Sequence, residues 1–455
     1  MLKRRTLLSS FAAAGLLGTA AACSPSGGGD SGSGGEGGGS DAGGSSGGDK
    51  GTLTFRLWDE NAVPAYEESF QAFTEQHGWE VEIDLVPWGD YWTRLPLDVA
   101  SGDAADVYWM NSANYILYKD SEDLLDINEV IPDGASQWEQ SVVDLYTRDG
   151  GLWGVPQVWD SIALFYNKTL TDEAGVDPTA LSFDASDDSD ALREAAAALT
   201  VDGEGRGPDE EGFDPDSREQ FGFNSQADRQ AILGPFLASN GAQWQQDDAY
   251  TFASDEGIEV IQYLSDLINV DHVAPSAADT NENGDFTRDL FTQGKLGLFQ
   301  SGPYNLAAIA EGVDDSFEWA IAPPVEGPEG AKSLVHGVVA VGNAKADEDR
   351  QEGIAALLTW LGSAEGQLPL AEQGIAFPGH VDAQDAFLSY WEEQGVDVSP
   401  FVDAAQNPAE ADTGSRANAG LTAAMPIFQE IFIGRLTAEE GLPQAQEEGN
   451  DAMEE

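Results

Sequence analysis

The sequence predicts an α/β fold divided into two lobes, on two observations. One is a regular alternation of strand and helix patterns near the start of the chain. The other is length, because about 400 residues remain after the N-terminal 50 are set aside, and one hydrophobic core rarely organises so many. We therefore expect two lobes, the first of them built around a parallel sheet covered by helices.

The alternation begins just after residue 51. Residues 52–57 and 81–85 alternate apolar with polar side chains, as half-buried strands do, and residues 105–109 form a third strand-like run. Asn61 is positioned to cap a helix between the first two strands, and a second helix, containing Pro96, precedes the third strand. This alternating order of strands and helices is typical of a parallel sheet covered by helices. Ligands of such sheets bind at the carboxyl ends of the strands.

The middle and the end of the chain are richer in helices and loops, and they show no repeat at the periods of solenoids or propellers. Apolar patterns predict a helix over 258–268 capped by Ser254, a helix over 286–292, strands over 296–299 and 333–341, and a helix over 354–361. Strand and helix patterns thus recur along the chain after residue 51, with loops between them.

Residues 1–22 have the layout of a signal peptide for export. Three basic residues, 3–5, precede an apolar run that ends in small residues before Cys23, the single cysteine of the chain. The run is short and alanine-rich for a membrane span, and no later segment is more suitable. The arrangement resembles the lipobox of bacterial and archaeal lipoproteins, with Ala20 where Leu is usual, and it implies lipidation at Cys23. The Arg4-Arg5 pair also resembles a twin-arginine signal.

Residues 24–50 are almost entirely Gly, Ser and Asp. A segment of this composition cannot form a core and is expected to behave as a flexible coil, with a root-mean-square reach of roughly 30 Å. Residues 23–50 are therefore interpreted as a lipidated cysteine on a flexible tether. We expect an exported protein anchored by lipid to the outer face of the cytoplasmic membrane, within reach of another component of that membrane.

The chain is strongly acidic, with 82 Asp and Glu against 20 Lys and Arg and a formal net charge of −62. Such a surface attracts neither nucleic acid nor anionic lipid headgroups, so both are excluded as partners. A charge of this size is typical of a protein that must stay soluble in salt, and it says little about the fold.

Five segments resemble landmarks of one protein family, in the order in which the family has them. They are SGDAADVYWMN from residue 101, GVPQVWDSIALFYNK from 154, LTVDGEGRGPDEEGFDPDSREQFGF from 199, FTQGKLGLFQSGPYN from 291 and WLGSAEGQLPLAEQG from 360. Through them the chain resembles the extracellular solute-binding proteins of ABC importers, of the maltose-binding-protein kind that carries sugars. Each segment alone is a weak indication, and the ordered set behind an export signal is a strong one.

The resemblance implies a periplasmic-binding-protein type II fold, in which each lobe is a mostly parallel sheet flanked by helices and a hinge joins the lobes. By the same resemblance the N-terminal lobe comprises residues 52–157 plus 304–341, and the C-terminal lobe comprises residues 158–303 plus 342–450. The chain would cross the hinge near 158–161, 301–304 and 341–343. Ligand binding closes such lobes by a hinge motion.

The function implied is capture of a carbohydrate, an oligosaccharide, in the cleft between the lobes and its delivery to ABC permease subunits served by a cytoplasmic ATPase. No cofactor and no catalysis are expected, and the protein is expected to be a monomer. Three alternatives stay open: a binding protein for a polyamine, a binding protein for glycerol phosphate, and a surface-anchored glycoside hydrolase, which would need two carboxylates across a cleft.

Sugars present hydroxyl rims and C–H faces, so a sugar site needs polar groups and flat aromatic rings. Trp109, at the end of the third strand, resembles a stacking aromatic of the family, although a tryptophan there could instead belong to the lobe core. Asn111 and Ser112 follow it with side chains suited to hydroxyls. Asp160, at the first hinge crossing, resembles the family's acidic hinge residue, although a carboxylate in so acidic a chain is most often solvated.

Further candidate ligand-binding residues come from both predicted lobes. Tyr304 stands where relatives commonly have Trp after Gly-Pro, and it could equally pack the hinge. The remaining candidates are Asp59, Glu60 and Asn61 after the first strand, Trp244 in the second lobe, His336, Gln226 and Arg416.

Residues 279–290, DTNENGDFTRDL, match part of a calcium-binding loop. The twelfth position of such a loop supplies a bidentate Glu, and here it is Leu290. The same residues also suit a helix that leads into a strand. We therefore favour the helix leading into a strand and assign no metal ligands here, with calcium binding kept as the alternative.

Overall fold

The computed structural model describes residues 50–187, 189–246 and 248–454. The predicted signal peptide, Cys23 and most of the tether lie outside the described residues. Within the described part of the chain, no helix combines the length and the apolar character that crossing a bilayer requires.

The first of two large sheets has six strands in the order β16-β6-β15-β3-β1-β2. The strands are β1 (Thr52–Leu57), β2 (Glu80–Leu85), β3 (Val107–Asn111), β6 (Val155–Asp160), β15 (His336–Gly342) and β16 (Phe377–Pro378). β1 pairs in parallel with β2 and with β3, and the other neighbours are antiparallel. This sheet and the helices around it are called the first lobe.

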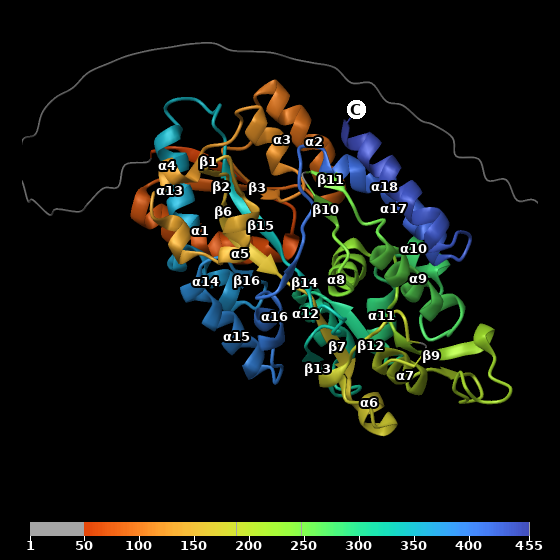
Figure 1. Ribbon diagram of the computed structural model, residues 1–455. Coiled ribbons are helices and arrows are strands. Elements are labelled where there is room, and N and C mark those ends of the chain that lie inside the picture. The colour runs from red at the N-terminus through yellow and green to blue at the C-terminus, as the bar shows by residue number, and fades with distance from the viewer. Residues whose placement is uncertain (1–49, 188, 247, 455) are drawn as a thin grey trace, which may run out of the picture. The chain divides into compact units, whose positions relative to one another are not determined.

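Helices from two separate parts of the chain, residues 63–145 and 351–393, cover the first sheet (Figure 1). They are α1 (Val63–His77), α2 (Trp88–Ser101), α3 (Tyr115–Asp120), α4 (Ile127–Val130), α5 (Gln140–Leu145), α13 (Gln351–Leu361), α14 (Ala364–Glu372) and α15 (Gln384–Glu393). Tyr66, Phe70 and Phe73 share the buried face of α1 because they are three or four residues apart. The helix ends where Gly78 takes a left-handed φ of 77°, a conformation that favours glycine.

The second sheet has five strands in the order β13-β7-β12-β9-β8. The strands are β7 (Ala163–Asn167), β8 (Val201–Asp202), β9 (Arg218–Phe223), β12 (Leu296–Ser301) and β13 (Trp319–Ala322). Of these neighbours, β9 and β12 are parallel and the others antiparallel. This sheet and the helices around it are called the second lobe.

The second lobe carries a larger number of helices, many of them short. They are α6 (Lys168–Ala174), α7 (Ala191–Ala198), α8 (Gly234–Ser239), α9 (Asp255–Asn269), α10 (Ala277–Glu282), α11 (Phe286–Thr292), α12 (Leu306–Val313), α17 (Ala417–Phe432) and α18 (Ala438–Glu454). Ser254 caps α9 as predicted, because its side chain accepts a hydrogen bond from the Gly257 amide. α17 and α18 pack side by side and against α9 (Figure 1).

Two sequence-based expectations about local structure and sheet order are wrong. Asn61 does not cap α1: Asp59 caps a short 3-10 turn, Glu60–Ala62, and α1 begins only at Val63. The sheets are mixed and not mostly parallel, because β15 and β16 re-enter the first sheet after the chain has returned from the second lobe, and they run against β6. The α/β two-sheet class itself is confirmed.

The chain passes between the two sheets at three places, two of which differ from those expected. The passages are β6 to β7 at 160–163, β14 (Ser333–Leu334) to β15 at 334–336, and α16 (Ser399–Ala404) to β17 (Pro408–Ala409) at 404–408. Residues 301–304 instead lead into α12, which packs on α11, and residues 341–343 lead toward α13, which packs on the first sheet. The strand β13 therefore belongs to the second lobe, and helices α13–α15 belong to the first, the reverse of the expected division.

Two buried serine hydroxyls connect these passages. Ser333 accepts a hydrogen bond from the Ile162 amide at 2.6 Å and donates one to the Ile162 carbonyl at 3.1 Å. Ser161 donates to the carbonyl of Phe401 at 2.6 Å. β14 and β17 also pair in parallel. Side-chain and backbone hydrogen bonds thus hold the three passages together as one hinge.

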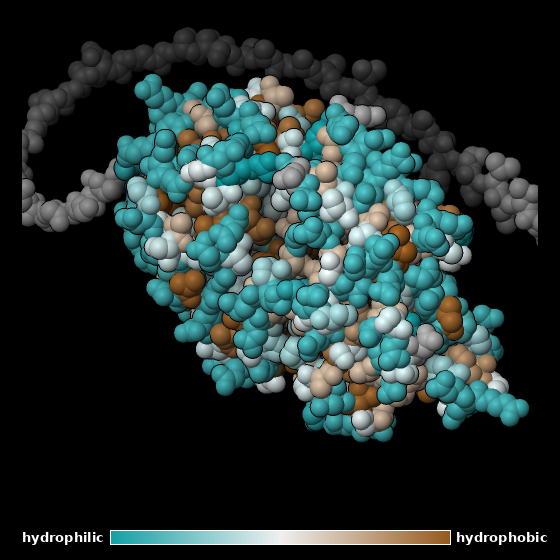
Figure 2. Space-filling model, viewed as in Figure 1, coloured by the Kyte–Doolittle hydropathy of each residue, from teal (hydrophilic) through white to brown (hydrophobic). Residues whose placement is uncertain are grey.

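The surface agrees with the acidic composition. The face in Figure 2 is covered mostly by hydrophilic residues, and its hydrophobic residues form small, separate groups. The large apolar side chains are instead gathered into two buried clusters. One fills the first lobe and continues into the second through residues such as Phe165 and Phe299, and the other lies within the second lobe.

We expect Ser333→Ala to destabilise the protein by about 1–3 kcal/mol, because the Ile162 amide would be left buried without its partner. Urea unfolding followed by circular dichroism measures this loss. Ser121→Ala is the control, since its hydroxyl bonds a carbonyl at an exposed position. Equal stabilities for the two variants would show that the Ser333 hydroxyl does not hold the hinge.

Candidate ligand-binding site

A cavity of about 220 Å³ lies between the two lobes beside the hinge. Its lining residues are Trp58, Asp59, Asn61, Ala62, Trp88, Trp109, Val158, Trp159, Asp160, Pro303, Tyr304, Ala307, His336, Val338, Ile375 and Ala376. Most come from the first lobe, at the carboxyl ends of β1, β3 and β6, and Pro303, Tyr304 and Ala307 come from the second. Of the sequence-predicted residues, six line this cavity: Asp59, Asn61, Trp109, Asp160, Tyr304 and His336.

Trp58 is the centre of an aromatic wall. Its ring packs edge-on against Trp88, Tyr91 and Trp109, with centroid distances of 5.2, 5.0 and 4.9 Å. Trp88 is 50% exposed and presents a free ring surface at the cavity. Edge-to-face packing of this kind holds rings in fixed orientations. The wall therefore offers rigid, flat apolar surface to a ligand.

Trp109 packs against Trp58 and also lines the cavity. It is 2% exposed, and its indole N–H donates to the Tyr66 hydroxyl at 3.1 Å, which donates in turn to the Gln157 side chain at 3.1 Å. The Tyr91 hydroxyl donates to the Trp109 carbonyl at 2.7 Å. Trp109 is thus both a lining residue and part of the core of the first lobe.

Asp160 and His336 form a polar side of the cavity. They are directly opposite one another in the antiparallel pair β6/β15. Gln230, from the second lobe, donates to Asp160 Oδ1 at 2.7 Å. Burial raises the pKa of the Asp160 carboxyl to about 8, and the hydrogen bond from Gln230 offsets only part of this rise. Burial also lowers the pKa of His336, so at neutral pH both groups are largely uncharged.

Tyr304 contributes a second-lobe ring from the short turn Pro303–Asn305. It is 48% exposed, and its hydroxyl accepts a hydrogen bond from Ser301 at 3.3 Å. The ring lies so close to Gly302 that a Cβ there would come within 2.2 Å of it. Glycine at position 302 therefore allows the tyrosine to fold back toward the hinge.

Two of the three residues predicted after β1 line the cavity, and they also form hydrogen bonds with one another. Asp59 Oδ1 accepts hydrogen bonds from the backbone and side-chain amides of Asn61, at 2.9 and 3.1 Å. Both residues line the cavity, whereas Glu60 is exposed and does not. The carboxylate of Asp59 is thus held in place by its neighbour at the cavity wall.

Three other predicted residues lie away from this cavity. Asn111 and Ser112 are each 6% exposed, and Asn111 accepts a hydrogen bond from Asn114 at 2.7 Å. Trp244 is packed in the second lobe under the Arg229 guanidinium, which lies 3.8 Å from its ring centroid. Its indole N–H donates to Asp412 at 2.8 Å.

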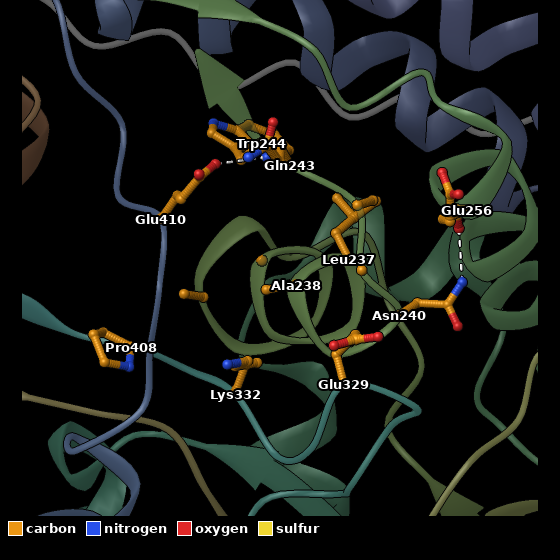
Figure 3. A pocket seen from close by; sticks show the side chains of 14 residues that line it. Leu237, Ala238, Asn240, Gln243, Trp244, Glu256, Glu329, Lys332, Pro408 and Glu410 are labelled. Atoms are coloured by element: carbon orange, nitrogen blue, oxygen red, sulfur yellow. Dashed lines mark hydrogen bonds between the residues drawn. The ribbon is translucent and has the colours of Figure 1, made fainter.

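Trp244 lines a separate cavity of about 410 Å³ in the second lobe. Figure 3 shows Glu410 directed at Trp244, whose backbone N–H donates to its carboxylate at 2.9 Å. Glu329 and Lys332 lie on the far side of the same cavity (Figure 3). The ring of Trp244 therefore does not face the aromatic wall of the first lobe.

Gln226 and Arg416 also do not line the cavity between the lobes. Gln226 accepts a hydrogen bond from Thr287 at 2.8 Å, and Arg416 is exposed just before α17. The partial calcium-loop pattern is folded as a helix, since Asp279 and Asn281 lie in α10. Within the described residues, no three His, Cys, Asp or Glu side chains are placed to hold a metal ion.

Sequence reasoning missed Trp58, Trp88 and Gln230. Trp58 directly follows β1, and Trp88 opens the helix after β2, so both stand where parallel strands present ligand groups. Gln230 lies at the start of a π-helical turn, Arg229–Leu233, which no simple periodicity predicts.

The pKa of Asp160 leads to a pH-dependent stability prediction. In the unfolded chain its carboxyl ionises near pH 4, whereas in the folded protein it keeps its proton up to about pH 8. The contribution of Asp160 to the free energy of unfolding therefore falls as pH rises from 4 to 8. Asp160→Asn removes this penalty. The melting temperature of the variant minus that of the unsubstituted protein should therefore increase from pH 4 to pH 8 and stay constant above pH 8.

Differential scanning calorimetry at several pH values, without ligand, measures this difference. Asp385→Asn, which removes an exposed carboxylate from α15, controls for the loss of one negative charge. A difference between Asp160→Asn and the unsubstituted protein that is constant from pH 4 to 8 would contradict the assignment.

Comparison with known proteins places this geometry in a family. The model of the bacterial extracellular solute-binding protein family matches residues 58–368, well over half of the 455-residue chain. The crystal structure of UspC from M. tuberculosis is 41% identical, covers 88% of this chain and 100% of its own, and superposes with a TM-score of 0.77.

More distant structures share the fold. The ABC substrate-binding protein Lmo0181 from Listeria monocytogenes, solved with cycloalternan, is 19% identical, covers 89% of this chain and 100% of its own, and has a TM-score of 0.74. The arabinooligosaccharide-binding protein of Halalkalibacterium halodurans is 26% identical over 47% of this chain and 44% of its own. The chain belongs to the bacterial extracellular solute-binding protein family, whose members bind solutes and are not enzymes.

Proposed function

We propose that this protein captures a carbohydrate, an oligosaccharide, in the cavity between its lobes and presents it to the permease of an ABC importer. The observation that carries the proposal is the aromatic wall of Trp58 and Trp88, which stands in one cavity with the uncharged polar groups of Asp160 and His336. Rotation at the hinge formed by the three chain passages would close the lobes around the ligand. This closure would create the surface that the permease recognises.

The chemistry of the cavity suits a sugar. The C–H face of a sugar ring gains free energy by covering an aromatic face, and its hydroxyls both donate and accept hydrogen bonds. A protonated carboxyl and a neutral imidazole each offer one donor and one acceptor, so they can pair with hydroxyls in either direction. Tyr304 adds a second-lobe ring and hydroxyl that would approach the ligand as the lobes close.

Known ligands of similar proteins support this class. Structures with the same fold are described as bound to cycloalternan and to maltose, and two relatives are named for arabinooligosaccharides. A shorter match, over 26% of this chain, is an erythritol/L-threitol-binding protein. All of these ligands are neutral polyhydroxyl compounds.

The charge of the cavity weighs against glycerol phosphate. Among the described residues that line it, none is Lys or Arg, and burial lowers the pKa of the one histidine. An anion would therefore lack a cationic partner. A polyamine has the opposite requirement, a set of ionised carboxylates, and Asp160 is largely protonated at neutral pH in the free protein.

Isothermal titration calorimetry on the full chain carrying Cys23→Ser would test the proposal. The probes are maltose, maltotriose, arabinotriose and erythritol, with spermidine and glycerol 3-phosphate for the two alternative solutes. Binding of at least one of the neutral probes supports the proposal, whereas binding of spermidine or glycerol 3-phosphate alone overturns it.

We expect Trp88→Ala to weaken binding of such a sugar by about 1–2 kcal/mol, about five- to thirtyfold in Kd, because an exposed ring face would be lost. The melting temperature without ligand should change little, since half of this side chain is solvent-exposed. Leu97→Ala is a matched control, because Leu97 is 65% exposed on the same helix and does not line the cavity.

Trp109→Ala serves as a second comparison. Its ring is buried, so truncation should cost about 3–5 kcal/mol of stability whatever it does to binding. If Trp88→Ala lowered the melting temperature as Trp109→Ala does and left the affinity unchanged, the aromatic wall would be core and not a ligand surface.

We further propose that Cys23 carries the lipid that anchors the protein outside the cytoplasmic membrane. The support is the basic and apolar segment before Cys23 and the Gly-, Ser- and Asp-rich segment after it. Cys23→Ser should release the protein into the medium or leave it unprocessed. Mass spectrometry and membrane fractionation measure this, and unchanged mass with full membrane retention would contradict it.

A further inference from the structure

We infer that an ion pair between Arg148 and Asp248 is a latch that holds the two lobes together across the cleft. Two guanidinium nitrogens of Arg148 face two carboxylate oxygens of Asp248, with distances of 2.6 Å for Nη2 to Oδ2 and 3.3 Å for Nη1 to Oδ1. Both side chains are partly exposed, at 33% and 38%. The inference concerns the opening of the lobes and does not depend on which solute is bound.

Arg148 is fixed to the first lobe. It lies in a small hairpin formed by β4 (Thr147–Arg148) and β5 (Gly151–Leu152). Trp153 donates from its indole N–H to the Arg148 carbonyl at 3.0 Å, and Leu152 is buried in the core cluster of the first sheet. The backbone that carries the guanidinium therefore moves with the first lobe.

Asp248 is fixed to the second lobe. It is at the turn of a hairpin formed by β10 (Gln245–Gln246) and β11 (Ala249–Tyr250), with a left-handed φ of 63°. Tyr250 is buried in the second-lobe core, and its hydroxyl donates to the Ala417 carbonyl at the start of α17, at 3.3 Å. The carboxylate therefore moves with the second lobe.

The Asp248 side of the pair is coupled to a hinge passage. Thr413 donates to Asp248 Oδ1 at 2.9 Å, and its backbone N–H donates to Gln245 at 2.8 Å. Thr413 follows β17, which pairs with β14 in the hinge, by only a few residues. Opening the lobes would have to separate Arg148 from a carboxylate that is itself attached to the crossing chain.

A second space between the lobes adjoins the pair. This cavity of about 470 Å³ is lined from the first lobe by residues that include Tyr115 and Arg148, and from the second by residues that include Gln245 and Thr413. The ion pair thus crosses between the lobes beside a space into which solvent or ligand can enter. Val335 lines this cavity, and its neighbour in the sequence, His336, lines the cavity that holds the aromatic wall.

The negative charge of the chain favours separation of the lobes, and the Arg148–Asp248 pair opposes that separation. With 82 acidic and 20 basic residues, the two lobes repel one another, and this repulsion favours opening. The other ion pairs formed by the described residues do not join the two lobes. They lie within one lobe or, in the case of Arg229 and Asp412, join the second lobe to the segment that follows β17. Arg148 also holds the pKa of Asp248 below its usual range, as expected for an attractive pair.

Single-molecule FRET on the ligand-free full chain tests the latch. Dyes at Leu117→Cys on α3 and Thr422→Cys on α17, in the Cys23→Ser background, report the separation of the lobes on either side of the pair, and both positions are exposed. Arg148→Gln and Asp248→Asn should each raise the ratio of open to closed molecules about two- to fivefold. Asn is chosen at 248 because it tolerates the left-handed backbone.

The two substitutions separate a latch from a general charge effect. Arg148→Gln makes the protein more negative and Asp248→Asn makes it less negative, so repulsion alone would shift the two ratios in opposite directions. A latch requires both to shift toward open, the double variant to open no further than either single one, and Arg148→Lys to restore part of the closed population. Circular dichroism and melting temperature confirm that each variant is folded.

Lys168→Gln is the matched control. It removes one positive charge and breaks a 2.8 Å pair with Glu318 that lies within the second lobe. Its open-to-closed ratio should equal that of the unsubstituted protein. An Arg148→Gln ratio no different from this control, or opposite shifts for Arg148→Gln and Asp248→Asn, would overturn the proposal.

Discussion

The hydrogen bonds of two buried serines at the hinge set the relation between the halves of this molecule. Ser333 makes two hydrogen bonds to Ile162, and Ser161 bonds the carbonyl of Phe401, so the three chain segments that pass between the sheets cannot slide past one another. Rotation is the motion that this arrangement leaves available. Asp160 ends β6 directly before Ser161, and His336 begins β15 three residues after Ser333, so the groups that face the cavity are positioned by the hinge itself.

The local elements of this fold could be predicted from sequence, and their long-range arrangement could not. Period-2 and period-3.6 patterns correctly indicate β1, α1 and α9, with the stop at Gly78 and the cap at Ser254, because these features depend on neighbouring residues. The direction of β15 depends on where the chain has been before it enters the sheet. An apolar run such as 336–342 reads the same in either direction, so the expectation of a mostly parallel sheet failed there.

The candidate site shows the same limit. Trp109 and Asp160 could be found because strand ends are recognisable and because the family resemblance supplied their positions. Trp244 is as suitable a residue type, yet it is covered by Arg229 and bonded to Asp412, a residue 168 positions away that no local pattern connects to it. Trp58 satisfies the strand-end rule, but a tryptophan there looks like core until its packing against the half-exposed Trp88 is known.

If the proposed function holds, the charge of the chain and the chemistry of the cavity act on different steps of binding. Recognition in the aromatic cavity, as proposed, would rely on rings, a largely protonated carboxyl and a neutral imidazole, none of which salt screens strongly. Closing, by contrast, would bring two highly acidic lobes together. The free energy of that step would depend directly on ionic strength. Added salt weakens both the repulsion between the lobes and the attraction of Arg148 for Asp248. Since many charges contribute to the first and a single pair to the second, salt should favour the closed form while leaving the intrinsic preference of the cavity for its ligand unchanged.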